Sequence, residues 1–159
     1  MSDEKLIAID AKSAPARATR SNYPPEFAAR TAKRVKHPLG DLFGLTVYGV
    51  NLTRILPGGI SALRHVHSLN DEFVYIVEGE PTLVTNAGET KLKPGMCAGF
   101  KAGTGDAHHL VNKTGKDVLY LEIGDRMKGD EVEYPDDDIK VTKDASGKRS
   151  FTHKNGTPF

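Results

Sequence analysis

Two histidines and a glutamate lie close together in an apolar stretch of the sequence. Residues 59–79 read GISALRHVHSLNDEFVYIVEG, with His65 and His67 two positions apart in a β-branched run. In a strand, both side chains point to the same face. Glu72 follows five residues after His67, and the polar residues 68–71 are typical of a turn, so Glu72 can return on a neighbouring strand toward the same interior. Two imidazoles and a carboxylate on one interior face indicate a site for a divalent transition metal ion.

In the alternative interpretation, these three residues bind no metal ion. Both histidines would then be satisfied by hydrogen bonds, and Glu72 would be solvated at the start of a strand. The metal site is favoured because several buried polar groups without compensation would be costly.

The spacing of these residues resembles the first signature of the cupin superfamily. Gly59 is followed after five residues by His65-x-His67, after four more by Glu72, and after six more by Gly79. The resemblance implies a jelly-roll β-barrel that holds one metal ion through three histidines and one glutamate. His65, His67 and Glu72 would supply three of these four ligands.

A second segment resembles the cupin signature that supplies the fourth ligand. Residues 91–112 read KLKPGMCAGFKAGTGDAHHLVN, and His108 and Asn112 have the spacing of its last two positions. The segment departs from the family pattern because Lys101 replaces the usual proline and the following loop is longer. Strand parity favours His108 as the ligand, since it shares a face with Asn112. His109 is the alternative, and otherwise lies in the pocket or on the outer face.

Short strand patterns at regular spacing, with turns rich in glycine, proline and asparagine, predict an antiparallel β-sandwich or barrel. Together with the cupin resemblance, which implies the jelly roll, they give an all-β antiparallel jelly-roll or β-barrel as the expected fold. We expect an N-terminal arm able to form a short helix from Pro24 over residues 1–41, and a barrel core over 42–124. Residues 125–159 are expected to form an acidic loop and C-terminal strands that pack on the barrel and pair around a turn at 144–147. The acidic run 129–138 is interpreted as a solvated loop, because it lacks the ligand spacing of a calcium-binding loop.

Composition excludes several classes of partner. The chain has 159 residues, 27% of them charged, and a formal net charge of +1. This balance gives no reason to expect a nucleic-acid partner. No apolar run approaches the length of a membrane span, and no secretory signal pattern opens the sequence. We therefore expect a cytoplasmic protein without a membrane partner.

The resemblance implies several activities on a small polar metabolite. The ligand set admits Fe, Mn, Ni, Zn or Cu as the divalent ion. Isomerisation of a sugar or sugar phosphate would need a general base and a phosphate clamp, for which Arg54 and Lys101 are the candidates. Dioxygenation would need Fe(II) and a dry apolar pocket. The predicted pocket residues are Arg54, Lys101, His109 and Asn112.

Two other classes of function stay open at this point. The protein can be a small-ligand or metal-binding module without turnover, or a structural cupin with no metal. Phe73, Tyr75 and Val77 alternate with the inward positions of their strand and predict an outward apolar face, which favours a homodimer.

Overall fold

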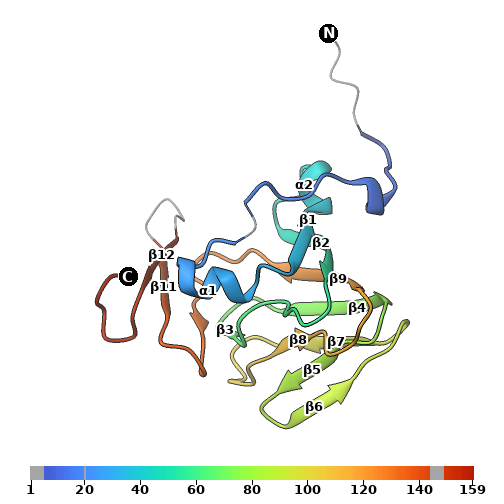
Figure 1. The fold of residues 1–159 in the computed structure, drawn as a ribbon. Helices are drawn as coiled ribbons and strands as arrows, with labels where there is room; N and C mark the ends of the chain where they lie inside the picture. The colour runs from blue at the N-terminus through green and yellow to red at the C-terminus, as the bar shows by residue number, and fades with distance from the viewer. Residues whose placement is uncertain (1–5, 20, 144–148) are drawn as a thin grey trace.

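A computed structural model of the chain describes residues 6–19, 21–143 and 149–159. Its largest sheet is antiparallel, with five strands in the order β1-β2-β9-β4-β7 (Figure 1). These strands are β1 (Arg34–His37), β2 (Tyr48–Ile55), β9 (Val118–Asp125), β4 (Glu72–Glu78) and β7 (Cys97–Phe100). Since β9 lies between β2 and β4, strands that are distant in sequence meet in the middle of the sheet, as in a jelly roll.

A three-stranded antiparallel sheet packs against the large one. It has the order β6-β5-β8 and consists of β6 (Gly88–Lys91), β5 (Thr82–Thr85) and β8 (His109–Val111). The main core draws residues from both sheets: Ile55, Val74, Ile76, Leu83, Leu92, Leu110, Val118 and Tyr120. The predicted all-β antiparallel barrel is therefore confirmed.

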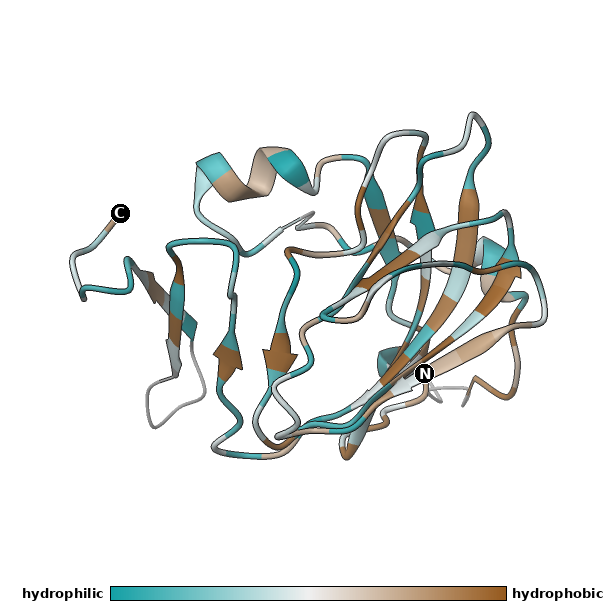
Figure 2. Ribbon diagram, turned by 90° about the horizontal axis from the view of Figure 1, so that it is seen from below, coloured by the Kyte–Doolittle hydropathy of each residue, from teal (hydrophilic) through white to brown (hydrophobic). Residues whose placement is uncertain are grey.

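Period-two alternation explains which residues of these strands enter the core. Along β4, Val74 and Ile76 are 6% and 0% exposed, whereas their neighbours Phe73 and Tyr75 are 39% and 41% exposed. Figure 2 shows the same alternation of apolar and polar residues along several strands. The face of β4 that carries Val74 also carries Glu72, so the pattern that builds the core also aims Glu72 inward.

Further segments lie on either side of the barrel, and some of them form a second core. They comprise η1 (Ala11–Ser13), α1 (Pro25–Arg30), α2 (Leu39–Leu42), β3 (Val66–His67) with its partner β10 (Val132–Glu133), and the hairpin of β11 (Lys140–Lys143) and β12 (Arg149–Thr152). This core contains Phe27, Leu63, Tyr134, Ile139 and Val141. The helix α1 and the hairpin thus lie at one end of the molecule, away from β5 and β6 (Figure 1).

The helix expected from Pro24 forms as α1, with Pro25 at its first position. The turn expected at residues 144–147, between the C-terminal strands, lies outside the described residues. None of the helices in the described part of the chain has the length and apolar character that a membrane span requires.

Two glycines of the histidine-containing signature occupy positions where a side chain would clash. A Cβ at Gly59 would lie 2.8 Å from the Cβ of Lys33 and 3.0 Å from the carbonyl oxygen of Leu56. Gly79 has φ +79°, and a Cβ there would lie 2.5 Å from the carbonyl oxygen of Asp117. Close backbone approach therefore explains why the segment that carries the histidines and Glu72 begins and ends with glycine.

Candidate metal centre

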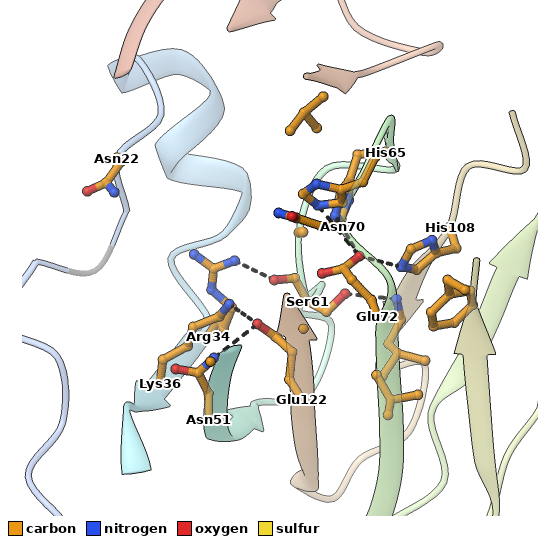
Figure 3. Close-up of a pocket in the computed structure, with 18 of the residues that line it drawn as sticks. Asn22, Arg34, Lys36, Asn51, Ser61, His65, Asn70, Glu72, His108 and Glu122 are labelled. Carbon is orange, nitrogen blue, oxygen red and sulfur yellow. Dashed lines mark hydrogen bonds and ion pairs between the residues drawn. The ribbon is translucent and has the colours of Figure 1, made fainter. Parts of the chain in front are cut away.

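Three histidines surround one carboxylate oxygen inside the barrel. The Nε2 atoms of His65 and His67 lie 3.5 and 3.6 Å from Glu72 Oε2. One ligand atom from each of these three residues lies within 4.8 Å of the other two. His108 falls outside that compact group of three, but its Nε2 is 3.2 Å from the same Glu72 oxygen (Figure 3). The four side chains predicted as ligands thus face a common point.

Three separate segments position these four side chains. His65 precedes β3 and forms an isolated antiparallel bridge with His108, which precedes β8. His67 belongs to β3, and Glu72 is the first residue of β4. The ring of His108 stacks on Phe100 of β7, with ring centroids 3.4 Å apart and the planes inclined by 2°. The stack fixes the orientation of His108 from outside the cluster.

Hydrogen bonds orient two of the rings. His67 Nδ1 lies 2.7 Å from the carboxylate of Asp130, and His65 Nδ1 lies 2.8 Å from the carbonyl oxygen of Leu63. Because both partners only accept hydrogen bonds, the proton of each neutral ring belongs on Nδ1. The Nε2 lone pairs of His65 and His67 therefore point toward Glu72. Metal-binding histidines in proteins are held in the same way.

The acidic run after the barrel contributes directly to this arrangement. Asp130 is 3% exposed and, besides His67, accepts hydrogen bonds from the backbone N–H of Leu69 and of Asn70 and from the Asn70 side chain. The expectation that residues 129–138 form a solvated loop is therefore wrong for Asp130. Its carboxylate can be buried because these hydrogen bonds compensate for its desolvation.

The electrostatics of the cluster suit a cation. Burial raises the pKa of Glu72, but His108 and His65 beside it lower that pKa further, so that it lies well below its ordinary value. Burial lowers the pKa of His108, which favours its neutral form. Within the described residues, Glu72 Oε2 is buried and has no hydrogen-bond partner. Neutral imidazole lone pairs facing a carboxylate oxygen repel one another unless a cation lies between them, so these residues fit a divalent metal ion.

The cluster forms part of the wall of a cavity of about 350 Å³. Apolar side chains line it in part, among them Val74, Phe100 and Leu110. The remaining lining is largely polar and includes a second carboxylate, Glu122. Basic side chains in the lining come from four elements or loops: Arg17, Arg34, Lys36, Arg126 and Arg149.

Two of the predicted pocket residues lie on other faces of their strands. Arg54 forms an ion pair of 2.9 Å with Asp117 at the surface, because its position on β2 alternates with the inward Ile55. His109 alternates with His108, and its Nδ1 donates to the carbonyl oxygen of Ala62. Neither residue lines the cavity that contains the metal-site cluster.

Lys101 and Asn112 also lie outside the lining of this cavity. Lys101 is exposed in the loop that follows β7. Asn112 is fully buried, and its amide donates to the carbonyl oxygens of Ile55 and Lys116 at 2.9 and 2.8 Å. Asn112 therefore ties the turn before β9 to the end of β2.

Sequence reasoning missed the polar residues that line the cavity on the large sheet, the sheet that also carries Glu72. Glu122 belongs to β9, and its carboxylate lies 2.5 Å from Lys36 Nζ of β1. Glu122 shares a face with Val118 and Tyr120 in the run VLYLEIG, so its place among apolar inward positions was a usable signal. Lys36 offered less, because the short segment 34–37 has no clear strand pattern of its own.

Comparison with known proteins agrees with this architecture. A family profile described as the cupin domain matches residues 51–124. A crystal structure described as a sugar phosphate isomerase of a cupin superfamily, from Silicibacter pomeroyi DSS-3, is 41% identical over 96% of this chain and 96% of that chain, with a TM-score of 0.88. A putative sugar phosphate isomerase from Acidithiobacillus ferrooxidans ATCC 23270 is 29% identical over 79% of this chain and 80% of that chain, with a TM-score of 0.70.

A more distant similarity is to an enzyme with a different activity. A salicylate 1,2-dioxygenase from Pseudaminobacter salicylatoxidans is 21% identical over 59% of this chain and 28% of that chain, with a TM-score of 0.50. At this identity the likeness concerns the fold alone. A search of curated proteins found no significant match.

The 41% identity to the Silicibacter pomeroyi protein over 96% of this chain shows that the chain belongs to the cupin superfamily.

Proposed function

We propose that this protein is a metal-dependent enzyme that isomerises a small sugar phosphate. In this proposal His65, His67, Glu72 and His108 hold one divalent transition metal ion. A single observation carries the proposal: one cavity combines this cluster with a second carboxylate and several arginines. An aldose–ketose isomerisation needs these same three elements, namely a site that polarises a carbonyl or hydroxyl, a proton-transferring group and a holder for the phosphate.

The candidate metal ligands meet the first of these requirements, the site that polarises a carbonyl or hydroxyl. The bound ion would act as a Lewis acid on the sugar's carbonyl and hydroxyl oxygens. The chain's own contribution is to place three imidazole Nε2 atoms at 3.2 to 3.6 Å from one carboxylate oxygen of Glu72. Asp130 and the carbonyl oxygen of Leu63 hold two of the imidazoles in place.

The arginines in the cavity lining could form the binding site for the phosphate. Arg34 is buried in the cavity wall and donates to the carbonyl oxygen of Ser61 at 2.5 Å (Figure 3). Arg17 and Arg149 also line the cavity, and neither has an ion-pair partner among the described residues. Guanidinium groups are well suited to phosphate because their planar array of N–H donors matches its oxygens.

The character of the cavity supports isomerisation rather than dioxygenation. A dioxygenase would need a dry apolar pocket, and Val74 and Leu110 do contribute apolar surface. The carboxylates of Glu72 and Glu122 and the arginines instead favour a polyhydroxylated anion as the substrate. The cavity of about 350 Å³ suits a small metabolite. The likeness to a sugar phosphate isomerase at 41% identity supports the same substrate class.

The proposal is tested with purified protein loaded in turn with Fe(II), Mn(II), Ni(II), Zn(II) or Cu(II). Each form is assayed on a panel of aldose and ketose phosphates, with oxygen uptake followed in parallel. We expect isomerisation of at least one phosphorylated sugar, its loss on chelation, and no activity on the unphosphorylated sugar at the same concentration. A saturable thermal shift with sugar phosphates but no product would contradict the enzyme and indicate a binding module.

We further propose a homodimer formed through the outward face of the large sheet. Phe73 and Tyr75 point away from the cavity on β4 and are exposed. Pairing of this face with a second copy would remove these apolar side chains from water. Light scattering should give twice the mass of one chain, and replacement Tyr75→Asp should shift the mass toward that of a monomer. A monomeric mass for the wild type would contradict the dimer.

A further inference from the structure

Glu122 lies on the same inward face of the large sheet as Glu72. It is on the neighbouring strand, two residues from the position opposite Glu72. Strands β4 and β9 are antiparallel neighbours in which Glu72 is opposite Gly124 and Val74 is opposite Glu122. Residues on such a diagonal have Cα atoms roughly 7–8 Å apart. Between the two carboxylates, Gly124 has no side chain, and a Cβ there would approach Glu72 Cγ to 3.4 Å. Glu72, Gly124 and Glu122 all line the cavity, so a small molecule in it can lie beside both carboxylates.

Three neighbouring side chains donate to the two oxygens of Glu122. Lys36 Nζ lies 2.5 Å from Oε1, and the Asn51 amide donates to the same oxygen at 3.4 Å. The Tyr120 hydroxyl donates to Oε2 at 3.1 Å. The carboxylate thus has a fixed orientation in the cavity wall (Figure 3). Burial opposes its ionisation, but Lys36 lowers the pKa of Glu122 below its ordinary value, so the group is a carboxylate at neutral pH.

The Lys36–Glu122 pair differs from the other lysine and arginine ion pairs in the described part of the chain. Its side chains are only 17% and 20% exposed. In each of the others, the side chain of at least one partner is 43% exposed or more. A buried pair adds little stability over apolar residues of the same size, because both charges lose their hydration. A stabilising role alone therefore explains this pair poorly.

We infer that Glu122 is the catalytic residue that transfers the proton in the isomerisation, an inference that rests on the proposed function. Glu122 takes the hydrogen on the carbon next to the carbonyl as a proton. The electron pair of that C–H bond becomes the C=C bond of an enediolate, and the carbonyl π pair moves onto its oxygen. Return of the proton to the former carbonyl carbon, with one hydroxyl proton passing between the two oxygens, gives the isomeric sugar without gain or loss of atoms or electrons.

Lys36 and Tyr120 are positioning residues in this scheme. Lys36 holds Glu122 ionised through Oε1, and the Tyr120 hydroxyl orients Oε2. Burial raises the pKa of Tyr120 well above its ordinary value, so its hydroxyl keeps its proton and remains a donor. The metal-site residues do not take part in the proton transfer in this scheme, which leaves Glu122 as the group to change.

The test uses Glu122→Gln in the metal-loaded protein, with conversion followed in D₂O. Loss of a general base typically costs about 10²- to 10⁴-fold in rate, so we expect kcat to fall at least about 100-fold. Wild-type product should carry solvent deuterium, and the variant should not exchange it. Metal content should be unchanged. The matched control is Glu89→Gln, whose glutamate pairs with Lys113 at the surface outside the cavity and should leave kcat unchanged.

A second variant separates catalysis from stability, because Glu122→Gln leaves Lys36 buried without its partner carboxylate. The double variant Lys36→Met with Glu122→Gln removes both charges and should recover thermal stability. We expect it to stay inactive. Recovery of activity in the double variant, unchanged kcat in Glu122→Gln, or wild-type product without deuterium would each overturn the role of Glu122 while leaving the isomerase intact. Absence of turnover by the wild type on every sugar phosphate would overturn the proposed function, and this inference with it.

Discussion

At the scale of single residues, the orientation of the histidines matters as much as their identity. His67 donates through Nδ1 to Asp130 and His65 through Nδ1 to Leu63, which leaves both Nε2 atoms facing Glu72. A cluster built only to bury histidines would not need the lone pairs to face a carboxylate. The outer hydrogen bonds are therefore part of the candidate metal centre. Of the two outer partners, Asp130 uses its side chain, so it can be substituted while every candidate ligand is kept.

We predict that Asp130→Asn weakens metal affinity by about 10- to 100-fold, the usual cost of losing a carboxylate behind a histidine ligand. The physical reason is that the neutral amide holds His67 less firmly and makes its Nε2 less basic. The measurement is the dissociation constant for the preferred metal by competition with a chelator.

The matched control is Asp138→Asn, because Asp138 also bonds to the Nδ1 of a histidine, His153, but at the surface. Affinity should be unchanged in this variant. Equal effects of the two substitutions would indicate that Asp130 acts through general charge rather than through His67.

The sequence predicted the cluster but not the rest of the cavity. His65, His67 and Glu72 could be found because strand parity and one short turn determine their common face. His108 could be found because its segment resembles the second cupin signature, and parity with Asn112 then favoured His108 over His109. Arg54 and Lys101 were chosen for their charge and nearness to the motifs. Their placement depends on which face of the strand, or which loop, each occupies, and for Arg54 the alternation with Ile55 would have indicated the outward face.

At the scale of elements, the strands bring together residues that are far apart in sequence. β9 lies between β2 and β4, so Glu122 comes beside Glu72 although fifty residues separate them. Such a pairing cannot be read from periodicity, which gives the face of a strand but not its neighbours. The same limit applies to β1 and β10, each of which is short and recognisable only through its partner.

The glycine that ends the first signature gives a prediction at this scale. Gly79→Ala should lower the free energy of unfolding by at least about 2 kcal/mol, because the residue has positive φ and its Cβ would lie 2.5 Å from the carbonyl oxygen of Asp117. Denaturant unfolding measures the change. Gly115→Ala is the control: a Cβ at Gly115 would have no atom within 4 Å, so stability should change by less than about 0.5 kcal/mol. Equal stabilities of the two variants would contradict this explanation of the turn.

At the scale of the whole molecule, the lining of the cavity extends beyond the cupin domain that carries the candidate metal centre. The profile of the cupin domain covers residues 51–124, yet Arg17, Tyr23 and Arg149 also line the cavity. They come from the N-terminal segment and from β12 of the C-terminal hairpin. The barrel carries the candidate metal ligands, so in the proposed function the flanking segments would supply the groups that recognise the phosphate.

We predict that Arg149→Ala raises KM for a sugar phosphate about tenfold, equivalent to about 1.4 kcal/mol, while kcat changes much less. The reason is that Arg149 lines the cavity without an ion-pair partner among the described residues, so its charge is available to the phosphate. Steady-state kinetics measure both constants. The control Arg54→Ala removes an arginine already paired with Asp117 outside the cavity and should leave KM unchanged. An unchanged KM in Arg149→Ala would exclude Arg149 from phosphate recognition.

The most direct test of the candidate metal centre is the metal stoichiometry of the purified protein, measured by elemental analysis after exposure to divalent transition metals and removal of the excess. We predict one ion per chain for the wild type. Little metal should remain in His65→Ala, His67→Ala and Glu72→Gln, with the folded state retained by circular dichroism, whereas His109→Ala should keep the wild-type content. A wild-type protein that binds no metal, or a His65→Ala variant that retains a full equivalent, would contradict a metal centre at these residues.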